Sequence, residues 1–488
     1  MLKNRFVLFF LSLFAIFTMS HAISYCQQMG SGQVIGKSSD VTWKLFGNLK
    51  IYPTNGANID FNGNDTDMAW ILDESGTMDH NSIRAEARLG FDVTGANFNF
   101  MSILEGDFVL NANNTDRGSG QPMGQANNGM SGEDFGIEKL EAGYDFSYLN
   151  LPVRLSAGWN DKFLDRTGGL LYGDDHPFVG LNGTVKNVDY MFLYITILDD
   201  ISLEDGEQPI WDADDLDWRV YTLKLTFHLP FLDAKFSPFY AYSDNNNKNA
   251  NVHYIGFETY GKYNIFIPRA EFIYATGDKD GLNGMNNVDI SAFASFLSLE
   301  ADIKEYFIPY IGTYFLSGDG DADDGKIHAF NAITNNARYS EVFGMENAFI
   351  HRWSPVLGST LYSNSPEMLG GEGSGYGGLS ATSSANSPGM ITAGIGAKGK
   401  IGKFNYKSQF QYLLFASTGA LEDYYGKDDI DNEMGIMWDT NLTYHFSNHF
   451  SIGDTFTVFS PGDGYQDIWG SDYDETAFLN TVEFVWSF

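Results

Sequence analysis

A run of alternating carboxylates is the first candidate for binding chemistry in this sequence. The stretch SGDGDADDG, residues 317–325, contains Asp319, Asp321, Asp323 and Asp324. Carboxylates at every second position of a turn can direct several oxygens at one hard cation, as calcium requires. The match to a helix-flanked calcium loop is incomplete, because the glycine comes one place late and no glutamate occupies the twelfth position. The stretch predicts a structural calcium in a loop, with a solvated acidic loop as the alternative.

A second group of charged residues recurs at every second position of long, two-faced segments. In residues 80–93, Arg84, Glu86 and Arg88 share one face, and apolar residues occupy the other. Rings of charged side chains set ion selectivity where such segments surround a pore. The alternative is that these residues pair with one another across the wall of an occluded lumen. By parity we predict these pore-lining residues: Arg84, Glu86, Arg88, Glu141, Arg154, Lys224, Arg269, Glu271, Lys407 and Gln409.

Enzyme motifs are missing from the sequence. It contains no G-x-S-x-G, no H-E-x-x-H, no Walker loop and, with one cysteine, no set of zinc-binding cysteines. We therefore predict that the protein is not an enzyme and that it uses no cofactor beyond the calcium considered above. The 63 Asp and Glu against 29 Lys and Arg give a net charge of −34, which argues against binding to nucleic acid phosphates.

The segments that carry these charges are predicted to be strands. Residues 80–93, 403–416 and 432–446 alternate between apolar and polar side chains with a period of two, as a strand requires. Soluble sandwich strands usually have ~5–6 residues. These segments are longer, and a strand needs ~9–11 residues to cross the hydrocarbon of a bilayer. The pattern therefore favours an all-β protein whose strands cross a membrane.

The connections between these strands alternate between two kinds. Eight are short turns, and nine are long, polar and rich in glycine. Outer-membrane barrels alternate short periplasmic turns with long outer loops in this way. We therefore predict a transmembrane antiparallel β-barrel of 18 strands, with 16 as the alternative because strands near 178–186, 290–301 and 388–398 are the weakest. The long loops are expected at about 53–80, 111–133, 164–180, 199–216, 243–250, 277–289, 317–388, 417–431 and 461–474.

Two loops have distinctive composition. The longest, about 317–388, is expected to fold into the mouth of the barrel as a constriction or lid, or else to extend freely outside. Residues 199–217 contain nine acidic residues and no basic one. They predict a mouth that attracts cations, or divalent bridging to lipopolysaccharide, with a solvated loop as the alternative.

The chain divides into three predicted parts. Residues 1–22 have a basic start, an apolar stretch and a small-residue cleavage site, so they predict a signal peptide. A short N-terminal segment, 23–40, follows, and 41–488 form the barrel. Aromatic residues at the two membrane interfaces are expected to include Tyr52, Tyr148, Trp159, Trp218, Tyr242, Tyr263, Tyr306, Trp438 and Trp486.

The C-terminal residues resemble the last strand of Gram-negative outer-membrane proteins. Val482, Phe484, Trp486 and Phe488 match its alternating pattern with a terminal aromatic residue. The resemblance implies a signal for the barrel-assembly machinery. We expect this strand to close the barrel against residues 43–52, because an open edge in lipid would leave backbone groups unpaired.

A looser resemblance extends over the second half. Residues 269–281 and 432–465, with their Thr-Gly-Asp and Phe-Ser-Pro-Gly elements, resemble the alginate-export family and related 18-stranded porins. That family's alginate pathway is lined by basic side chains, whereas this chain is acidic, so the resemblance implies architecture and not the substrate.

These observations together predict an outer-membrane porin for passive diffusion of small hydrophilic solutes or ions. The alternatives are a structural or surface-binding barrel with a closed lumen, and an exporter of a polysaccharide. Expected partners are outer-membrane lipid, lipopolysaccharide, the barrel-assembly machinery and the solutes. Assembly into a homo-oligomer is left open, because a lipid-facing patch resembles a subunit interface.

Overall fold

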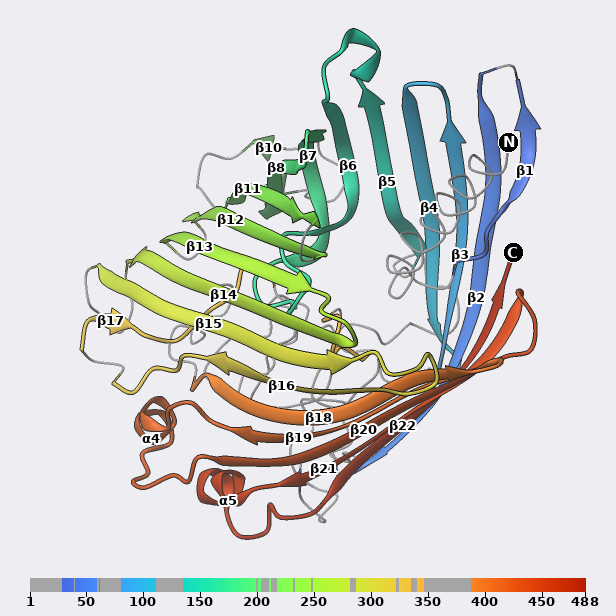
Figure 1. Ribbon diagram of the computed structural model, residues 1–488. Coiled ribbons are helices and arrows are strands. Elements are labelled where there is room, and N and C mark those ends of the chain that lie inside the picture. The colour runs from blue at the N-terminus through green and yellow to red at the C-terminus, as the bar shows by residue number, and fades with distance from the viewer. Residues whose placement is uncertain are drawn as a thin grey trace.

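The computed structural model describes residues 29–38, 40–58, 61, 80–110, 135–198, 201–202, 210–211, 217–230, 233–246, 249–280, 287–321, 324–334, 340–345 and 388–488. Almost all regular structure in these residues is β-strand (Figure 1). Within them, none of the helices has the length and the apolar character needed to cross a membrane. The signal peptide predicted at 1–22 and most of the loop at 317–388 lie outside the described residues.

Eighteen long strands form the wall of the barrel. The first nine are β2 (Thr42–Ala57), β3 (His80–Thr94), β4 (Phe98–Val109), β5 (Phe135–Asp145), β6 (Arg154–Phe163), β7 (Gly173–Val185), β8 (Val188–Leu198), β11 (Trp218–Leu229) and β12 (Ala234–Asn245). The other nine are β13 (Ala250–Gly261), β14 (Phe266–Lys279), β15 (Val288–Ala301), β16 (Ile308–Leu316), β18 (Met390–Ile401), β19 (Phe404–Leu414), β20 (Glu433–His445), β21 (Phe450–Pro461) and β22 (Ala477–Ser487).

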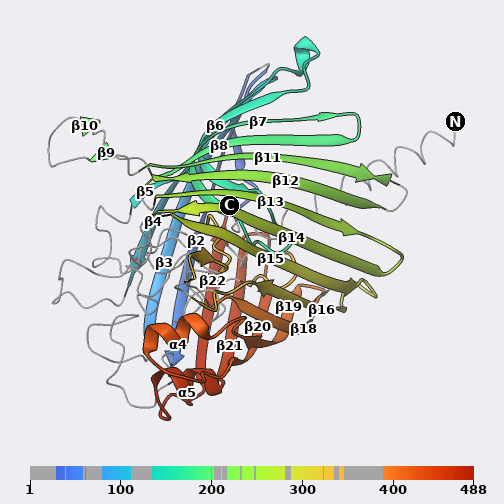
Figure 2. The same ribbon diagram turned by 90° about the vertical axis from the view of Figure 1, so that its left-hand side faces the viewer.

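Shorter elements accompany this wall, and two of them are paired with it in the same sheet. They are β1 (Gln33–Lys37), which pairs with β2, the hairpin of β9 (Ile201–Ser202) and β10 (Ile210–Trp211), β17 (Lys326–Ile327), the 3-10 turn η2 (Ser147–Leu149) and the helices α4 (Gly419–Tyr425) and α5 (Asp463–Trp469). The loops that carry α4 and α5 lie side by side at one end of the barrel (Figures 1 and 2). The backbone N–H of Asp431 donates to the carboxylate of Asp467 at 2.8 Å and links them.

Each wall strand pairs with its neighbour in chain order, and the last pairs with the first (Figure 1). In that closing pair Leu49 lies opposite Trp486, and Ile51 lies opposite Phe484. Phe488 and Gly47 exchange two backbone hydrogen bonds of 3.1 and 3.2 Å. The ring has no free edge, so every wall strand has a hydrogen-bonded neighbour on both sides. The predictions of 18 strands and of closure by the C-terminal strand are confirmed.

The alternation of short and long connections also matches the prediction. The main difference is at residues 173–180, for which the sequence predicts a loop but which form the first eight residues of β7. Asp174, Asp175, His176 and Pro177 make this part of the strand polar, so its alternation is difficult to recognise. The strands predicted near 290–301 and 388–398 are present as β15 and β18.

The outer face of the wall is apolar. Exposed side chains include Ile255, Phe272, Leu297, Ile311 and Ile395, and Ile395 is 58% exposed. Tyr263 and Tyr306 lie at the short-turn end and are 77% and 53% exposed, as expected of residues at a membrane interface. The same prediction was wrong for Tyr52 and Trp218, which are 6% and 1% exposed. The hydroxyl of Tyr52 donates to Glu86, and the indole N–H of Trp218 donates to Ser243, so both rings are used within the protein.

Candidate functional site

The connection between β6 and β7, residues 164–172, is the first of two segments that pack against the inner side of the wall. We call it the inner loop. One carboxylate joins the two ends of the loop, because Asp165 accepts the backbone N–H groups of Leu170, Leu171 and Tyr172 at 2.5, 3.0 and 2.9 Å. Asp165 is buried, and burial raises its pKa. The inner loop is therefore a compact turn built around its own acceptor.

Charged side chains of the wall hold the inner loop. Glu258 on β13 accepts the backbone N–H groups of Arg166 and Thr167 at 3.0 and 3.1 Å. Glu271 on β14 accepts the N–H of Gly168 at 2.6 Å. Lys224 on β11 donates to the carbonyl of Leu164 at 2.6 Å and also pairs with Glu258. Three strands thus fix the loop through polar contacts.

The second infolded segment belongs to the long connection between β16 and β18. We call residues 329–334 and 340–345 the inner strap. The N–H groups of Ile333 and Thr334 donate to the carbonyl of Leu171 at 3.1 and 3.2 Å, and the hydroxyl of Ser340 donates to the carbonyl of Thr167 at 3.1 Å. The inner loop and the inner strap therefore form one hydrogen-bonded unit.

Wall residues also bind the inner strap. Lys407 donates to the carbonyl of Gly344 at 2.5 Å, and the side-chain amide of Gln409 donates to the carbonyl of Phe343 at 3.0 Å. Arg269 pairs with Glu341 of the strap and, at 2.8 Å, with Glu300 of β15. Arg269, Lys407 and Gln409 lie four to six residues from the short turns that precede β14 and β19. The described part of the long connection therefore reaches deep into the barrel, which favours the constriction over the freely extended loop.

Phe343 is the apolar anchor of the strap. Its ring lies 5.4 Å from that of Tyr310, 6.0 Å from that of Tyr314 and 6.2 Å from that of Phe296, measured between ring centres. A Cβ atom at Gly394 would lie only 2.6 Å from the Phe343 ring. Glycine at that position lets the ring approach the wall, and the aromatic contacts add apolar burial to the polar anchors.

The opposite part of the wall carries a dense charge network. Arg88 on β3 contacts Glu86, Glu105 and Glu138 at 3.1, 2.5 and 3.0 Å, so one cation faces three carboxylates. Lys50 on β2 adds a contact of 3.2 Å to Glu86. Further pairs extend the network across β5 and β6: Lys139 with Asp161, Glu141 with Lys162 at 2.7 Å, and Arg154 with Asn99.

The predicted pore-lining residues thus fall into two groups. Lys224, Arg269, Glu271, Lys407 and Gln409 hold the inner loop and strap, whereas Glu86, Arg88, Glu141 and Arg154 belong to the charge network. Arg84 lies on β3, and its side chain is outside the described residues.

Sequence reasoning missed several members of these groups, among them Glu105, Glu258, Glu300 and Lys398, which pairs with Glu300 at 2.6 Å. The same parity rule identifies them. Glu258 and Tyr260, for example, alternate with Phe257 and Thr259 along β13.

Carboxylates of the predicted calcium stretch accept hydrogen bonds from nearby backbone N–H groups. The carboxylate of Asp319 accepts the N–H groups of Asp321 and His328, both at 3.2 Å, and burial raises its pKa. Asp324 accepts the N–H of Lys326 at 2.8 Å. Asp323 lies outside the described residues, among which there is no group of three or more potential metal ligands. Calcium binding stays a prediction, as does cation attraction by 199–217, where only 201–202, 210–211 and 217 are described.

Solved structures of other proteins match this fold. Pseudomonas aeruginosa OpdK, in a structure with vanillate, matches with a TM-score of 0.53 and 10% identity, over 91% of this chain and 98% of that one. Acinetobacter baumannii OccAB2 matches with 0.52 and 11%, over 91% and 98%. The chain shares the fold of these proteins. Another structure, of the outer membrane protein OpdK from Pseudomonas aeruginosa, matches with 0.51 and 9%, over 93% and 100%.

Comparison of the sequence with known proteins finds no relative. No family model matches the chain, and no curated protein matches it significantly. The porin-like 18-stranded barrel is confirmed as the fold. The resemblance to the alginate-export family stays a prediction.

Proposed function

We propose that this protein is an outer-membrane porin through which small hydrophilic solutes or ions diffuse passively. The observation that carries the proposal is the two-faced wall, with charged residues such as Arg88 and Glu258 inside and an apolar band outside. Barrels of ~16–18 strands are wide enough to leave an aqueous channel. The likeness to the outer membrane protein OpdK, which was also solved with vanillate, supports the location and an encounter with a small solute.

The inner loop and strap supply the constriction in this proposal. They bind to wall residues on β11 to β19, so the charge network on β2 to β6 forms the facing side of the path. Glutamates outnumber the arginine around Arg88, and the whole chain is acidic, so passage of cations is favoured over passage of anions. Catalysis has no part in the proposal.

The partners follow from the location. Lipid surrounds the apolar band, the long loops face lipopolysaccharide, and the C-terminal strand is the signal for the barrel-assembly machinery. The acidic loops are where calcium bridging is proposed.

Single-channel recording in planar bilayers tests the proposal. Purified, folded protein is expected to give ohmic steps, and in a salt gradient the reversal potential should indicate cation preference. A clear anion preference would contradict the charge argument. If folded protein gave no steps at all, the porin proposal would fail.

A closed structural or surface-binding barrel is the second candidate. It is favoured by the number of contacts that fix the inner loop and strap, which are built like a permanent plug. The two candidates differ in what happens when an anchor is removed. A porin conducts with all anchors intact, whereas a plugged barrel conducts only after they are broken.

A further inference from the structure

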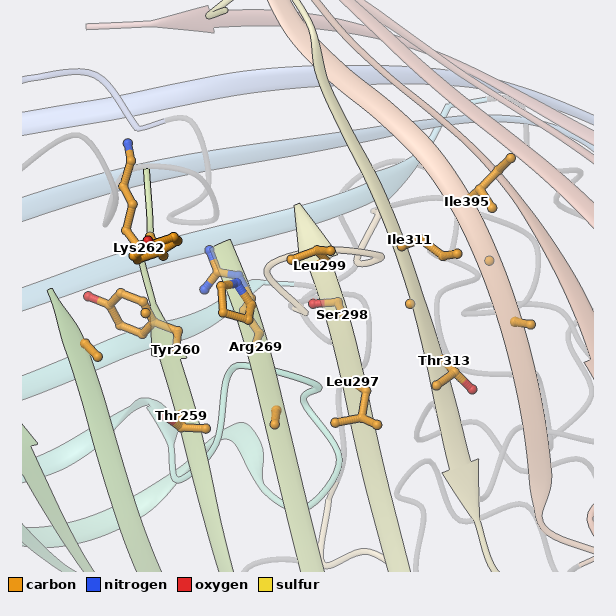
Figure 3. Close-up of a pocket in the computed structure, with 18 residues that line it drawn as sticks. Thr259, Tyr260, Lys262, Arg269, Leu297, Ser298, Leu299, Ile311, Thr313 and Ile395 are labelled. Atoms are coloured by element: carbon orange, nitrogen blue, oxygen red, sulfur yellow. The ribbon is translucent and has the colours of Figure 1, made fainter. Parts of the chain in front are cut away.

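The outer wall has a hollow of about 820 Å³ across β13 to β18 (Figure 3). Its floor is a row of residues that face one another in register on successive strands: Thr259, Ala270, Leu297, Thr313 and Ala393. Four of these five side chains are small, whereas the rest of the outer wall is rich in large apolar residues. The row therefore forms a groove.

Both sides of the groove are large and apolar. Toward the long loops, the rings of Phe257, Phe272, Phe293 and Phe315 follow one another at centre distances of 6.3, 6.4 and 4.9 Å. Toward the short turns, the next outward row consists of residues that are again opposite one another in register: Pro268, Leu299, Ile311 and Ile395. The groove is thus a bounded apolar slot of a size typical of ligand sites, ~300–1,000 Å³.

The end of the groove nearest the short turns is polar. Lys262 and Asp302, on neighbouring turns, form an ion pair of 2.7 Å with side chains 42% and 34% exposed. Tyr263, beside them, is the aromatic residue that marks the interface. Lys262 and Tyr263 both line the groove, so an apolar slot leads to a pair of opposite charges at headgroup depth.

We propose that this groove binds one glycerophospholipid with a zwitterionic headgroup. An acyl chain lies along the row of small residues, the phosphate meets Lys262, and the ammonium group meets Asp302. The site rests on the proposed function only in placing this wall in a bilayer. A second copy of the chain fits less well, because a twofold contact centred on the groove would place hollow against hollow and leave the space unfilled.

Filling the groove tests the proposal. We expect delipidated wild-type protein to bind one molecule of palmitoyl-oleoyl phosphatidylethanolamine in native mass spectrometry. Ala270→Trp and Ala393→Trp occupy the slot and should weaken binding by roughly tenfold through lost apolar contact. Ile255→Trp, on the same outer wall but outside the groove, is the matched control and should bind as the wild type does. Ala393→Leu is a milder variant if a tryptophan impairs assembly.

The headgroup contacts have their own test. Lys262→Gln should weaken binding of phosphatidylethanolamine, with the acyl chain site intact. Equal binding by Ala270→Trp, Ala393→Leu and the Ile255→Trp control would overturn the site. So would wild-type oligomers that disappear in the filled variants, because they would identify a second copy as the occupant. Conductance measured on the same samples does not depend on lipid binding to the outer wall. Absence of conductance would therefore contradict the porin proposal without contradicting the lipid site.

Discussion

At the scale of single residues, the balance of charge around Arg88 is the most consequential feature. The guanidinium lies among three glutamates, and Lys50 supports one of them. A buried charge is tolerated only when it is paired, and removing one partner leaves the others uncompensated. Arg88 therefore holds together side chains that would otherwise repel one another, and it limits the negative potential on this side of the lumen.

Arg88→Gln should increase cation preference and reduce stability, because three carboxylates lose their common partner. The expected loss is about 3 kcal/mol. The reversal potential measures the first effect, and the denaturation midpoint measures the second. Arg219→Gln, in the half-exposed pair with Asp217, is the control and should cost less than about 1 kcal/mol. An unchanged reversal potential would place Arg88 outside the ion path.

At the scale of elements, the wall and the infolded segments depend on different interactions. The strands are held by backbone pairing around the ring. The inner loop and strap are held to the wall by side chains, chiefly Glu258, Glu271, Arg269 and Lys407. Loss of such side-chain contacts can loosen a segment locally while the paired scaffold stays folded. The size of the passage can therefore change without a change in the barrel.

Glu258→Ala removes the acceptor of two loop N–H groups and the partner of Lys224, so the inner loop should loosen. We expect single-channel conductance to increase by roughly twofold, with more current noise, because the constriction widens. Glu305→Gln, an exposed residue of the turn between β15 and β16, should leave conductance unchanged. Wild-type-like conductance in Glu258→Ala would show that the loop does not limit flow.

Packing of the strap gives a second prediction at this scale. Gly394→Ala introduces a methyl group 2.6 Å from the Phe343 ring, which must move or strain the wall. The expected cost is about 1–3 kcal/mol, measured by chemical denaturation. Gly136→Ala is the matched control, since a Cβ there meets nothing within 4 Å. If both variants were equally stable, Phe343 would not be packed against this glycine in solution.

At the scale of the whole molecule, closure joins the two ends of the barrel wall. Phe488 makes two backbone hydrogen bonds with Gly47, next to the pairing of β2 with β22. The same aromatic residue is predicted to be part of the assembly signal. One residue therefore bears on how the barrel forms and on how it stays closed.

Deletion of Phe488 should lower the yield of folded barrel in the outer membrane severalfold, while barrels that do form keep their conductance. Yield is measured by heat-modifiable migration on gels, and conductance by bilayer recording. Phe410→Ala, which removes an exposed aromatic ring elsewhere on the wall, is the control and should assemble normally. Normal assembly of the deletion variant would contradict the signal.

Much of the wall could be predicted because its signal is local and periodic. Glu86 and Arg88 were assigned to the inner face from the residues beside them, since side chains alternate between the faces of a strand. The first half of β7 was missed because polar residues occupy both of its faces. Tyr52 and Trp218 were misplaced because residue type suggests an interface, whereas their hydrogen-bond partners decide their position.

The sequence by itself determined that this protein is an antiparallel barrel, closed by its last strand against its first, with charges within, and it favoured 18 strands over 16. Only the tertiary structure decided that the inner loop and strap fill part of the lumen and that five predicted pore residues are their anchors. The physical reason is that these contacts join residues that are far apart along the chain. Ser340 and Thr167 are 173 residues apart, and contacts between irregular segments leave no period in the chain. The groove on the outer wall has the same origin, because four small side chains from different strands align only when the register is set.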